Sequence, residues 1–436
     1  MKLRSLNNAT ILLESRDNTL LIDPWIVGDL YHGAWTPVVK MDDLKFLKSV
    51  SHVFISHIHE DHWDRKTLEL LNKDVIIFIP NLQINKVLKK YIEELGFHNI
   101  KFIDFFVKEN LGDLQITIVP PMNAFGQELG SYYNSYETDA THIDTSLLVE
   151  DSLSNTSHLF LCDNTPYDLS VIREFFKNTK LTSLWYPFNS YAQDYPVCYD
   201  FTESELVKIH DEMHFKRKET IRKCIQFLKP QYYFPHSADF ILNGPVSKKF
   251  NSYICKEFFD RNLVALNYDF PELKHSLSKY ALFGDVINFD NSGEIKIKRD
   301  QFKYELLKSK SHLKQLPSKL NGNTTTHIKE AFKNMLKRCK NFNIDISNAK
   351  NWILTIKTEM YEFNFSYDYE RLLEENELDK KYKKRLMVLL TQEKLEALLS
   401  RELHWNNAQI GYHINFKRIP NIYCQELYKS LNFLHL

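Results

Sequence analysis

The chain has 436 residues, of which 43% are hydrophobic and 26% are charged, and this ordinary globular composition excludes a disordered or fibrous protein. Lysine and arginine together number 56, as do aspartate and glutamate, so the formal net charge is zero and gives no general attraction for nucleic acid. No run of about 18 apolar residues occurs, so we expect no membrane-spanning helix. At roughly 150 residues per domain, the length predicts two or three domains.

Short apolar segments follow one another in the first part of the chain. Ile11–Leu13 and Thr19–Ile22 flank a polar turn and predict a β-hairpin. Further strands are expected at Val53–Ser56, Val75–Ile79, Leu114–Val119, Ser146–Val149 and Leu159–Cys162. Helices are expected at Lys66–Leu71, Leu82–Leu95 and Glu203–Leu228. Strands that alternate with helices after an initial hairpin predict an α/β fold, with a mixed sheet covered by helices.

The polar segment 315–327, QLPSKLNGNTTTH, contains Pro, Gly and three Thr and is the predicted linker. We therefore expect a first domain over residues 1–314 and a C-terminal accessory domain over residues 328–436. Ahead of the linker, Asp285–Phe289 and Ile295–Ile297 predict a second hairpin. After it, the chain is expected to be helical from Ile328 to about Arg401 and then to end in strand and loop.

The six cysteines lie more than twenty residues apart. This spacing is typical neither of a dense disulfide framework nor of a paired-cysteine metal motif. The N-terminal sequence also lacks the apolar core of a secretory signal. We therefore expect a cytoplasmic protein with reduced thiols.

The 17 histidines are unevenly distributed, and three of them lie within six residues. His57, His59, Asp61 and His62 form the pattern H-x-H-x-D-H directly after the strand-like segment Val53–Ile55. The motif is therefore expected in a loop where a buried strand ends, a usual place for functional groups. Neutral imidazoles and a carboxylate are ligands that zinc prefers, and they also suit iron or manganese. The motif predicts a metal site, in which the last two members can serve a second metal nearby.

One loop cannot complete such a site, and three later residues are candidates for the missing ligands. His142 precedes the strand-like Ser146–Val149, Asp163 ends the apolar run LFLC, and His236 follows QYYFP. Each is a ligand type at the edge of an apolar segment. Taken singly, each is weak evidence for a metal ligand, but their order along the chain after the first motif supports that role.

In this order of motifs, the chain resembles the metallo-β-lactamase superfamily, which implies an αββα sandwich and a dinuclear metal centre. The resemblance implies that His57, His59 and His142 hold the first metal and that Asp61, His62 and His236 hold the second. It implies that Asp163 bridges the two metals and that Asp61 also orients the nucleophile. Asp23, in LLIDPW, matches the acidic residue that often lies behind the ligands and orients a ligand imidazole.

A looser resemblance, to the metallo-β-lactamase-like part of CMP-N-acetylneuraminate hydroxylases, spans most of the chain. It rests on the segments IDTSLLVE, DYPVCYDF, LKPQYYFP and HWNNAQIGYHINFKRIPNIY. Those hydroxylases carry a Rieske iron–sulfur domain, which needs two Cys/His pairs that do not occur in this sequence. They also lack a histidine at the position of His236. Both differences favour a hydrolase over an oxygenase.

Two loops rich in Tyr and Asn, 130–141 and 186–200, are candidates for substrate contacts, because these side chains hydrogen-bond and stack on polar ligands such as sugars. Asn189, Tyr191 and Tyr195 are the residues that we expect to make these contacts. The role of the C-terminal region stays open between forming part of the pocket and making a dimer contact, and Trp405–Asn407 is the place to look.

The sequence therefore predicts a metal-dependent hydrolase in which two divalent metal ions, zinc being the one we expect, activate water for attack on a carbonyl or phosphorus centre. We expect a small-molecule substrate, with a sugar- or nucleotide-linked compound favoured, and neither nucleic acid nor membrane as a partner. Homo-oligomerisation stays open. The alternative is an iron-dependent oxygenase that receives electrons from a separate protein, and a non-enzymatic binding module is a third interpretation.

Overall fold

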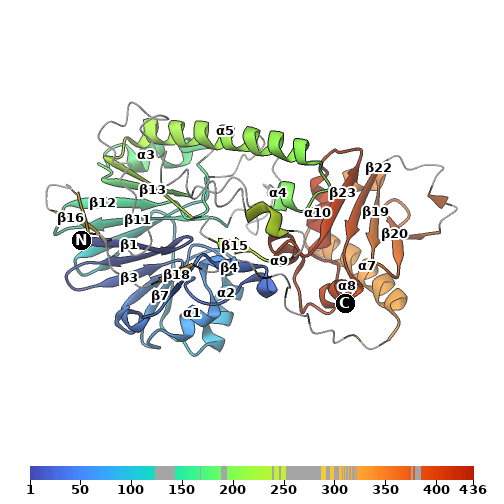
Figure 1. Ribbon diagram of the computed structural model, residues 1–436, viewed down its shortest axis with the longest axis horizontal. Coiled ribbons are helices and arrows are strands. Elements are labelled where there is room, and N and C mark those ends of the chain that lie inside the picture. Colours follow the sequence, from blue (N-terminus) through green and yellow to red (C-terminus); the bar gives the residue numbers. More distant parts are fainter. Residues whose placement is uncertain are drawn as a thin grey trace.

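A computed structural model describes most of the chain. The described residues are 1–122, 143–166, 168–187, 194–237, 240–244, 247–251, 286–290, 295–298, 304–306, 308, 310, 313, 316, 320, 322–374, 377–378 and 384–436. In this part of the chain, two large mixed sheets lie against each other, and a smaller sheet with its own helices lies beside them (Figure 1).

The first large sheet has eight described strands in the order β17-β16-β1-β2-β3-β6-β7-β8. Its strands are β1 (Lys2–Asn7), β2 (Thr10–Glu14), β3 (Thr19–Ile22), β6 (His52–Phe54), β7 (Ile76–Pro80), β8 (Ile100–Ile103), β16 (Val286–Phe289) and β17 (Ile295–Lys298). The strands from β17 to β3 pair antiparallel, whereas β3, β6, β7 and β8 pair parallel. Because β3, β6 and β7 run in one direction, the residues that follow them lie along one edge of the sheet.

The second large sheet has six described strands in the order β14-β13-β12-β11-β10-β9. Its strands are β9 (Lys108–Leu111), β10 (Leu114–Val119), β11 (Ser146–Asp151), β12 (Thr156–Phe160), β13 (Ser183–Pro187) and β14 (Tyr232–His236). It repeats the plan of the first sheet, since an antiparallel part is followed by the parallel strands β12, β13 and β14.

Alternate side chains explain why the two sheets stack. In β2, Ile11 and Leu13 point into the apolar layer between the sheets, whereas Leu12 points to the opposite face. In the second sheet, Phe160 joins the same inner layer and Leu159 points outward. Strands buried on both faces need a cover on the outside, and helices supply it.

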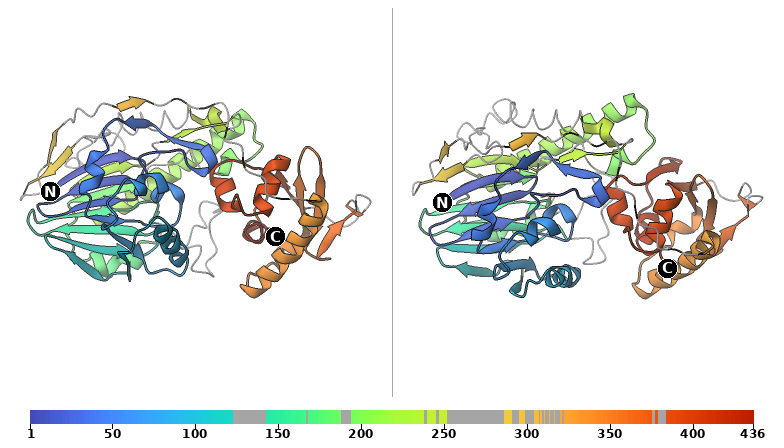
Figure 2. Two further views of the ribbon diagram at one scale, coloured as in Figure 1. Left: turned by 90° about the horizontal axis from the view of Figure 1, so that it is seen from below. Right: turned by 60° about the horizontal axis from the view of Figure 1, so that its bottom comes forward.

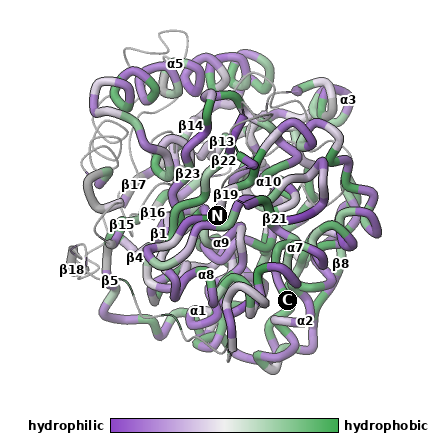
Figure 3. The backbone as a smooth tube through the Cα atoms, turned by 90° about the vertical axis from the view of Figure 1, so that its right-hand side faces the viewer, coloured by the Kyte–Doolittle hydropathy of each residue, from purple (hydrophilic) through white to green (hydrophobic). Residues whose placement is uncertain are grey.

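The outer covers are α1 (Arg65–Glu69) and α2 (Asn85–Glu94) on the first sheet, and α3 (Arg173–Phe176) and α5 (Glu203–Leu228) on the second. The long α5 lies at the top of Figure 1, on the side away from α1 and α2. Thr202 begins α5 with a capping box, in which its hydroxyl accepts from Glu205 N and Glu205 Oε2 accepts from Thr202 N. Hydrophobic and hydrophilic stretches alternate along α5 in Figure 3, as expected of a helix that buries one face.

The C-terminal part is a third layer built on a five-stranded sheet in the order β21-β20-β19-β22-β23. Its elements are α7 (Thr324–Asn341), β19 (Trp352–Lys357), β20 (Glu362–Ser366), β21 (Arg371–Leu373), β22 (Lys384–Leu389), α8 (Gln392–Leu399), α9 (Trp405–Ile410), β23 (Asn415–Ile419) and α10 (Gln425–Leu431). Both views in Figure 2 show this layer beside the two large sheets.

One continuous apolar core joins the C-terminal layer to the rest of the molecule. It contains Trp25, Tyr31 and Trp35 from the first hundred residues together with Trp405 and Phe416. Backbone pairing crosses the same boundary, because Phe416 N donates to the Cys198 carbonyl. Two short pairs, β4 (Trp35–Pro37) with β15 (Phe240–Leu242) and β5 (Val39–Met41) with β18 (Tyr304–Leu306), complete the described strands, and α4 (Asp194–Val197) lies between the layers.

Most of the expected elements of the first domain are present, and the C-terminal expectation needs a correction. The helix at Glu203–Leu228 and both hairpins have the predicted bounds within about two residues. The expected helical stretch from Ile328 to Arg401 is wrong beyond α7, because β19 to β22 occupy its middle. β19 and β20 are buried along nearly their whole length and show no alternation, and a short apolar run of this kind cannot be distinguished from a buried helix by its period alone. The helix α7 begins at Thr324, and the division of the chain at residues 314 and 328 stays a prediction.

Within the described residues, none of the helices has the length and apolar character needed to cross a membrane.

Candidate metal centre

The H-x-H-x-D-H motif lies where the sequence placed it, in the loop that follows a buried parallel strand. β6 ends at Phe54, and the loop continues through a short helical turn at Glu60–His62 before α1 begins. Asp64 caps α1 by accepting hydrogen bonds from Lys66 N and Thr67 N. The loop is therefore fixed between a strand in the sheet core and a capped helix.

Two groups of side chains in this region have ligand atoms that all lie within 4.8 Å of one another. The first is His57, His59 and Asp163, and the second is Asp61, His62 and Asp163. Asp163 follows β12 of the second sheet and belongs to both groups. The structure thus brings five predicted ligands together from both sheets, with the predicted bridging residue shared between the groups.

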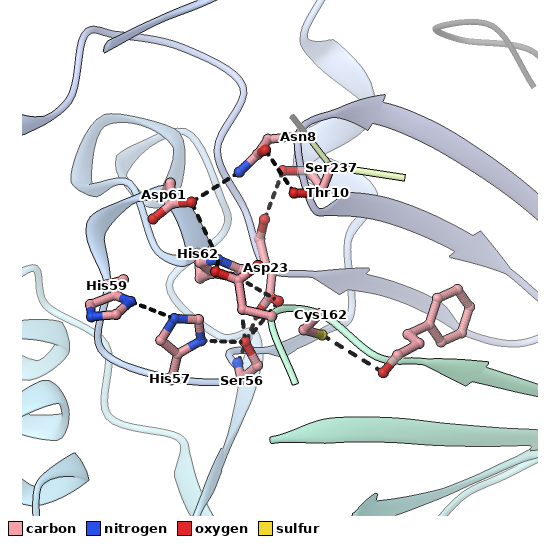
Figure 4. A network of polar contacts seen from close by, with 12 residues as sticks. Asn8, Thr10, Asp23, Ser56, His57, His59, Asp61, His62, Cys162 and Ser237 are labelled. Carbon is pink, nitrogen blue, oxygen red and sulfur yellow. Dashed lines mark hydrogen bonds and ion pairs between the residues drawn. The ribbon is translucent and has the colours of Figure 1, made fainter. Parts of the chain in front are cut away.

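Asp23 lies directly behind the loop, as Figure 4 shows, and is fully buried at the end of β3. Its Oδ2 accepts from His62 Nδ1 at 2.8 Å, and its Oδ1 accepts from Ser56 N at 2.7 Å. The Ser56 hydroxyl lies 2.8 Å from Asp23 Oδ2 and 2.9 Å from His57 Nδ1. These contacts orient His57 and His62 so that their Nε2 atoms face the two groups of ligand atoms.

The carboxylate of Asp61 is held by two residues that the motif did not reveal. Asn8 Nδ2 donates to Oδ2 at 3.0 Å, and the Tyr31 hydroxyl donates to Oδ1 at 2.6 Å. Burial and the neighbouring Asp61 and Glu60 raise the pKa of Tyr31 well above its usual value, so its hydroxyl stays a donor. No spacing rule connects Asn8 or Tyr31 with the motif, so only the fold identifies them.

The pKa values of the histidines in the loop are shifted in different directions. Burial lowers the pKa of His57 well below its usual value, and His62 and His59 lower it further. Burial also lowers the pKa of His59. For His62, burial lowers the pKa, but Asp61, Asp163 and Asp23 raise it more strongly. Burial raises the pKa of Asp61, but His62 outweighs it and keeps this carboxylate ionised. His57 and His59 are therefore neutral imidazoles and Asp61 is an ionised carboxylate, which are the protonation states that metal binding requires, whereas His62 has to release a proton when it binds a metal.

Several residues around the loop have left-handed backbone conformations although they are not glycine. The φ angles are 45° at Asn8, 46° at Asp23, 47° at Tyr31, 53° at Cys162 and 71° at Ser237. Ser237 donates from its hydroxyl to Asn8 Oδ1 and thereby extends the network around Asp61. Left-handed backbone outside glycine is uncommon and concentrates at functional sites. The presence of five such residues around the loop therefore agrees with a functional site at this position.

The remaining predicted site residues have different outcomes. His142, Asn189 and Tyr191 lie outside the described residues. His236 is buried at the end of β14, next to Ser237, and its ring lies 6.2 Å from that of Trp185. It is in neither ligand group, so its role as a ligand stays a prediction. Tyr195 packs its ring against Tyr199 and Phe201, and its contact with substrate also stays a prediction.

The C-terminal layer also contacts the loop. Asn406 Nδ2 lies 3.3 Å from His59 Nε2, and Asn407 Nδ2 donates to Glu60 Oε1 at 2.7 Å. Glu60 Oε2 accepts from Tyr31 N at 3.0 Å. Of the two roles left open for Trp405–Asn407, the structure therefore supports a contribution to the site.

The chain is similar over part of its length to several known proteins, although no family model matches it. It is 28% identical over 235 residues to a protein of Mycolicibacterium smegmatis named as a Rieske 2Fe-2S iron-sulfur protein, covering 52% of this chain and 41% of that one. It is 28% identical over 115 residues to the cytidine monophosphate-N-acetylneuraminic acid hydroxylase of Danio rerio, covering 25% and 19%. The matched segments thus span less than half of either relative.

Among solved structures, the chain is similar to a possible metal-dependent hydrolase from Veillonella parvula, with a TM-score of 0.46 and 14% identity. That comparison covers 66% of this chain and 98% of the other. Solved proteins of the metallo-β-lactamase superfamily are also among those that the chain resembles. The predicted likeness to the hydroxylase is confirmed over 115 residues of the chain.

Proposed function

We propose that this protein is a metal-dependent hydrolase with a dinuclear centre, built on an αββα sandwich of the metallo-β-lactamase type with the C-terminal residues 328–436 as an accessory domain. The observation that carries the proposal is Asp163, whose carboxylate belongs to two separate groups of ligand atoms. A carboxylate shared in this way is what a pair of metal ions a few ångströms apart requires.

The donor chemistry fits a pair of divalent ions such as zinc, with iron as the alternative. His57 and His59 present Nε2 and Nδ1 atoms 2.8 Å apart, and each has a lowered pKa that keeps its imidazole neutral. These two, with His142, would hold one ion, and Asp61, His62 and His236 would hold the other. Two such ions supply Lewis acidity and lower the pKa of water, which makes water a nucleophile at neutral pH.

The chain's own groups then determine the direction of attack. Tyr31 and Asn8 each donate to one oxygen of Asp61, so that this carboxylate has a fixed orientation. We assign to Asp61 the task of accepting a hydrogen bond from the attacking water and orienting it. The expected substrate is a polar small molecule, with a sugar- or nucleotide-linked compound favoured, and Asn189, Tyr191 and Tyr195 are proposed to contact it.

The test is to measure the metal content and hydrolysis of the same purified samples. The unaltered chain should contain stoichiometric metal and should hydrolyse at least one member of a panel of lactones, thioesters and phosphodiesters. His59→Ala should lose both metal and turnover. Full activity in a sample stripped by a chelator would contradict the proposal.

A second candidate is an iron-dependent oxygenase that receives electrons from a separate protein. It is favoured by the relatives, one named as a Rieske iron–sulfur protein and the other as a hydroxylase. The ligand types suit iron as well as zinc. Elemental analysis with a visible spectrum separates the two candidates. Colourless, zinc-containing protein that turns over without oxygen supports hydrolysis, whereas iron with an oxygen-dependent spectrum supports hydroxylation.

A further inference from the structure

The C-terminal layer contacts the metal-binding loop through two consecutive asparagines of α9. Asn406 reaches His59, and Asn407 reaches Glu60, the residue between the proposed ligands His59 and Asp61. In both contacts the partners are separated by 347 residues of sequence. A helix from one end of the chain therefore holds two neighbouring positions in a loop from the other end.

The short helix α9 is itself firmly anchored. Trp405 is almost fully buried, and its indole Nε1 donates to the Leu434 carbonyl at 2.7 Å. Beyond the helix, His413 Nε2 lies 2.7 Å from the Tyr31 carbonyl. Gly411 packs so closely that an added Cβ would lie 2.9 Å from Tyr31 Cβ. The two asparagines are thus held by a rigid segment rather than by a loose surface loop.

The orientation of the His59 ring shows which of its nitrogens can bind a metal and which can bind Asn406. His59 Nδ1 points toward His57 Nε2, so its other ring nitrogen, Nε2, faces Asn406. When Nδ1 of an imidazole binds a metal, Nε2 carries a proton that needs an acceptor. A half-turn of the Asn406 amide brings Oδ1 to this position, because an asparagine side chain carries both an acceptor and donors.

Asn407 has a complementary effect on the same loop. Glu60 accepts from Asn407 at one oxygen and from Tyr31 N at the other. Tyr31 in turn donates its hydroxyl to Asp61. Fixing Glu60 therefore fixes the backbone between His59 and Asp61, one proposed ligand of each metal.

We propose that Asn406 and Asn407 are positioning residues of the metal centre, with Asn406 accepting the proton of His59 Nε2 and Asn407 fixing Glu60. The inference rests on the proposed metal centre and makes metal affinity depend on the C-terminal layer. It adds to the centre a partner that lies outside the motif and outside both large sheets.

The test compares Asn406→Leu, which has a similar shape without an acceptor, with Asn406→Asp, which keeps the acceptor. The matched control is Asn348→Leu, because Asn348 is an exposed asparagine of the same layer that donates to Glu426. Zinc affinity is measured by competition with a chromophoric chelator, and the visible spectrum of the cobalt-loaded protein reports ligand geometry. Thermal unfolding of the chelated proteins verifies that each variant folds.

We expect Asn406→Leu to bind zinc about 10- to 100-fold more weakly and to alter the cobalt spectrum, the usual effect of removing a hydrogen-bond partner of a ligand. Asn406→Asp should bind zinc at least as tightly as the unaltered chain, and so should Asn348→Leu. Equal affinities for Asn406→Leu and the unaltered chain, or equal losses in Asn406→Leu and Asn406→Asp, would overturn this inference alone. Absence of metal binding in the unaltered chain would overturn the proposed function as well.

Asn407→Leu should weaken zinc binding less than Asn406→Leu, because Asn407 acts through Glu60 rather than on a ligand. Its cobalt spectrum should still differ from that of Asn348→Leu, and identical spectra would remove Asn407 from the proposal.

Discussion

The two large sheets contribute to the candidate metal centre in different ways. The first sheet provides four proposed ligands from one loop, residues 57–62, and orients them through Asp23 at the end of the adjacent strand. Among the described ligand groups, the second sheet provides the single residue Asp163, which belongs to both. The number of ligands that a segment contributes therefore does not show how much the centre depends on it, because the single carboxylate of Asp163 belongs to both ligand groups.

Replacing Asp163 is expected to have the largest effect on the centre. Asp163→Ala removes a ligand from both groups, so both metals should be lost and turnover should fall by at least about 100-fold. His62→Ala removes a ligand from one group only and should leave His57 and His59 able to retain part of the metal. Elemental analysis of both variants, prepared in parallel, measures the difference.

Equal loss of metal in the two variants would contradict the claim that Asp163 serves both ligand groups. In that case Asp163 would be an ordinary ligand of one ion. Thermal unfolding after chelation serves as the control, since both variants should then match the unaltered protein more closely than they do when metal is present.

The free energy of unfolding should depend on pH through a buried histidine that is not part of the metal centre. His158 of β12 is fully buried between the sheets, where its ring meets Phe289 of β16. Burial, followed by the charge of the N-terminal amine, lowers the pKa of His158 to about 3. Because the unfolded chain binds this proton near pH 6.5, the stability contributed by neutral His158 is present above that pH and is lost as the pH falls toward 3.

Between pH 7.5 and pH 5, this single group should reduce the free energy of unfolding by about 2 kcal/mol. Chemical denaturation of the chelated protein at the two pH values measures the change. His158→Gln cannot be protonated and should show a smaller decrease, and an equal decrease in both proteins would assign the acid sensitivity to other groups.

The smallest effect is expected at the exposed edge where the sheets meet. Lys101 of β8 forms an ion pair with Glu109 of β9 at 2.9 Å, and the two side chains are 53% and 32% exposed to solvent. Lys101→Ala should change stability by less than about 1 kcal/mol, because exposed ion pairs contribute little. Denaturation midpoints measure this, and a larger loss would mean that the sheets are joined by this ion pair as well as by their apolar layer.

The part of the structure that was predictable from the sequence is the part encoded by local patterns. The period of apolar residues predicted α5 and the hairpins, and the spacing of His57, His59, Asp61 and His62 predicted the loop chemistry. The position of Asp163 at the end of the apolar run LFLC made it a ligand candidate, but its bridging role was implied only by the family resemblance.

The residues that the sequence did not reveal act across long distances in the chain. Asn8 and Tyr31 approach Asp61 only because β1, β3 and β6 share one sheet. The C-terminal strands escaped prediction for a related reason. β19 contains residues that favour strands, but its short apolar run could equally be part of a buried helix, and its parallel partner β22 follows only after an intervening hairpin.

The contact between His59 and Asn406 has a consequence for the order in which the protein is made. The ribosome adds 347 residues between these two positions, which takes roughly 20 to 70 seconds at about 5–20 residues per second. During that interval the loop has left the ribosome while its last supporting residue has not been synthesised. The final geometry of the site is therefore available only after Asn406 has been synthesised, and a metal bound earlier would be held by an incompletely supported loop.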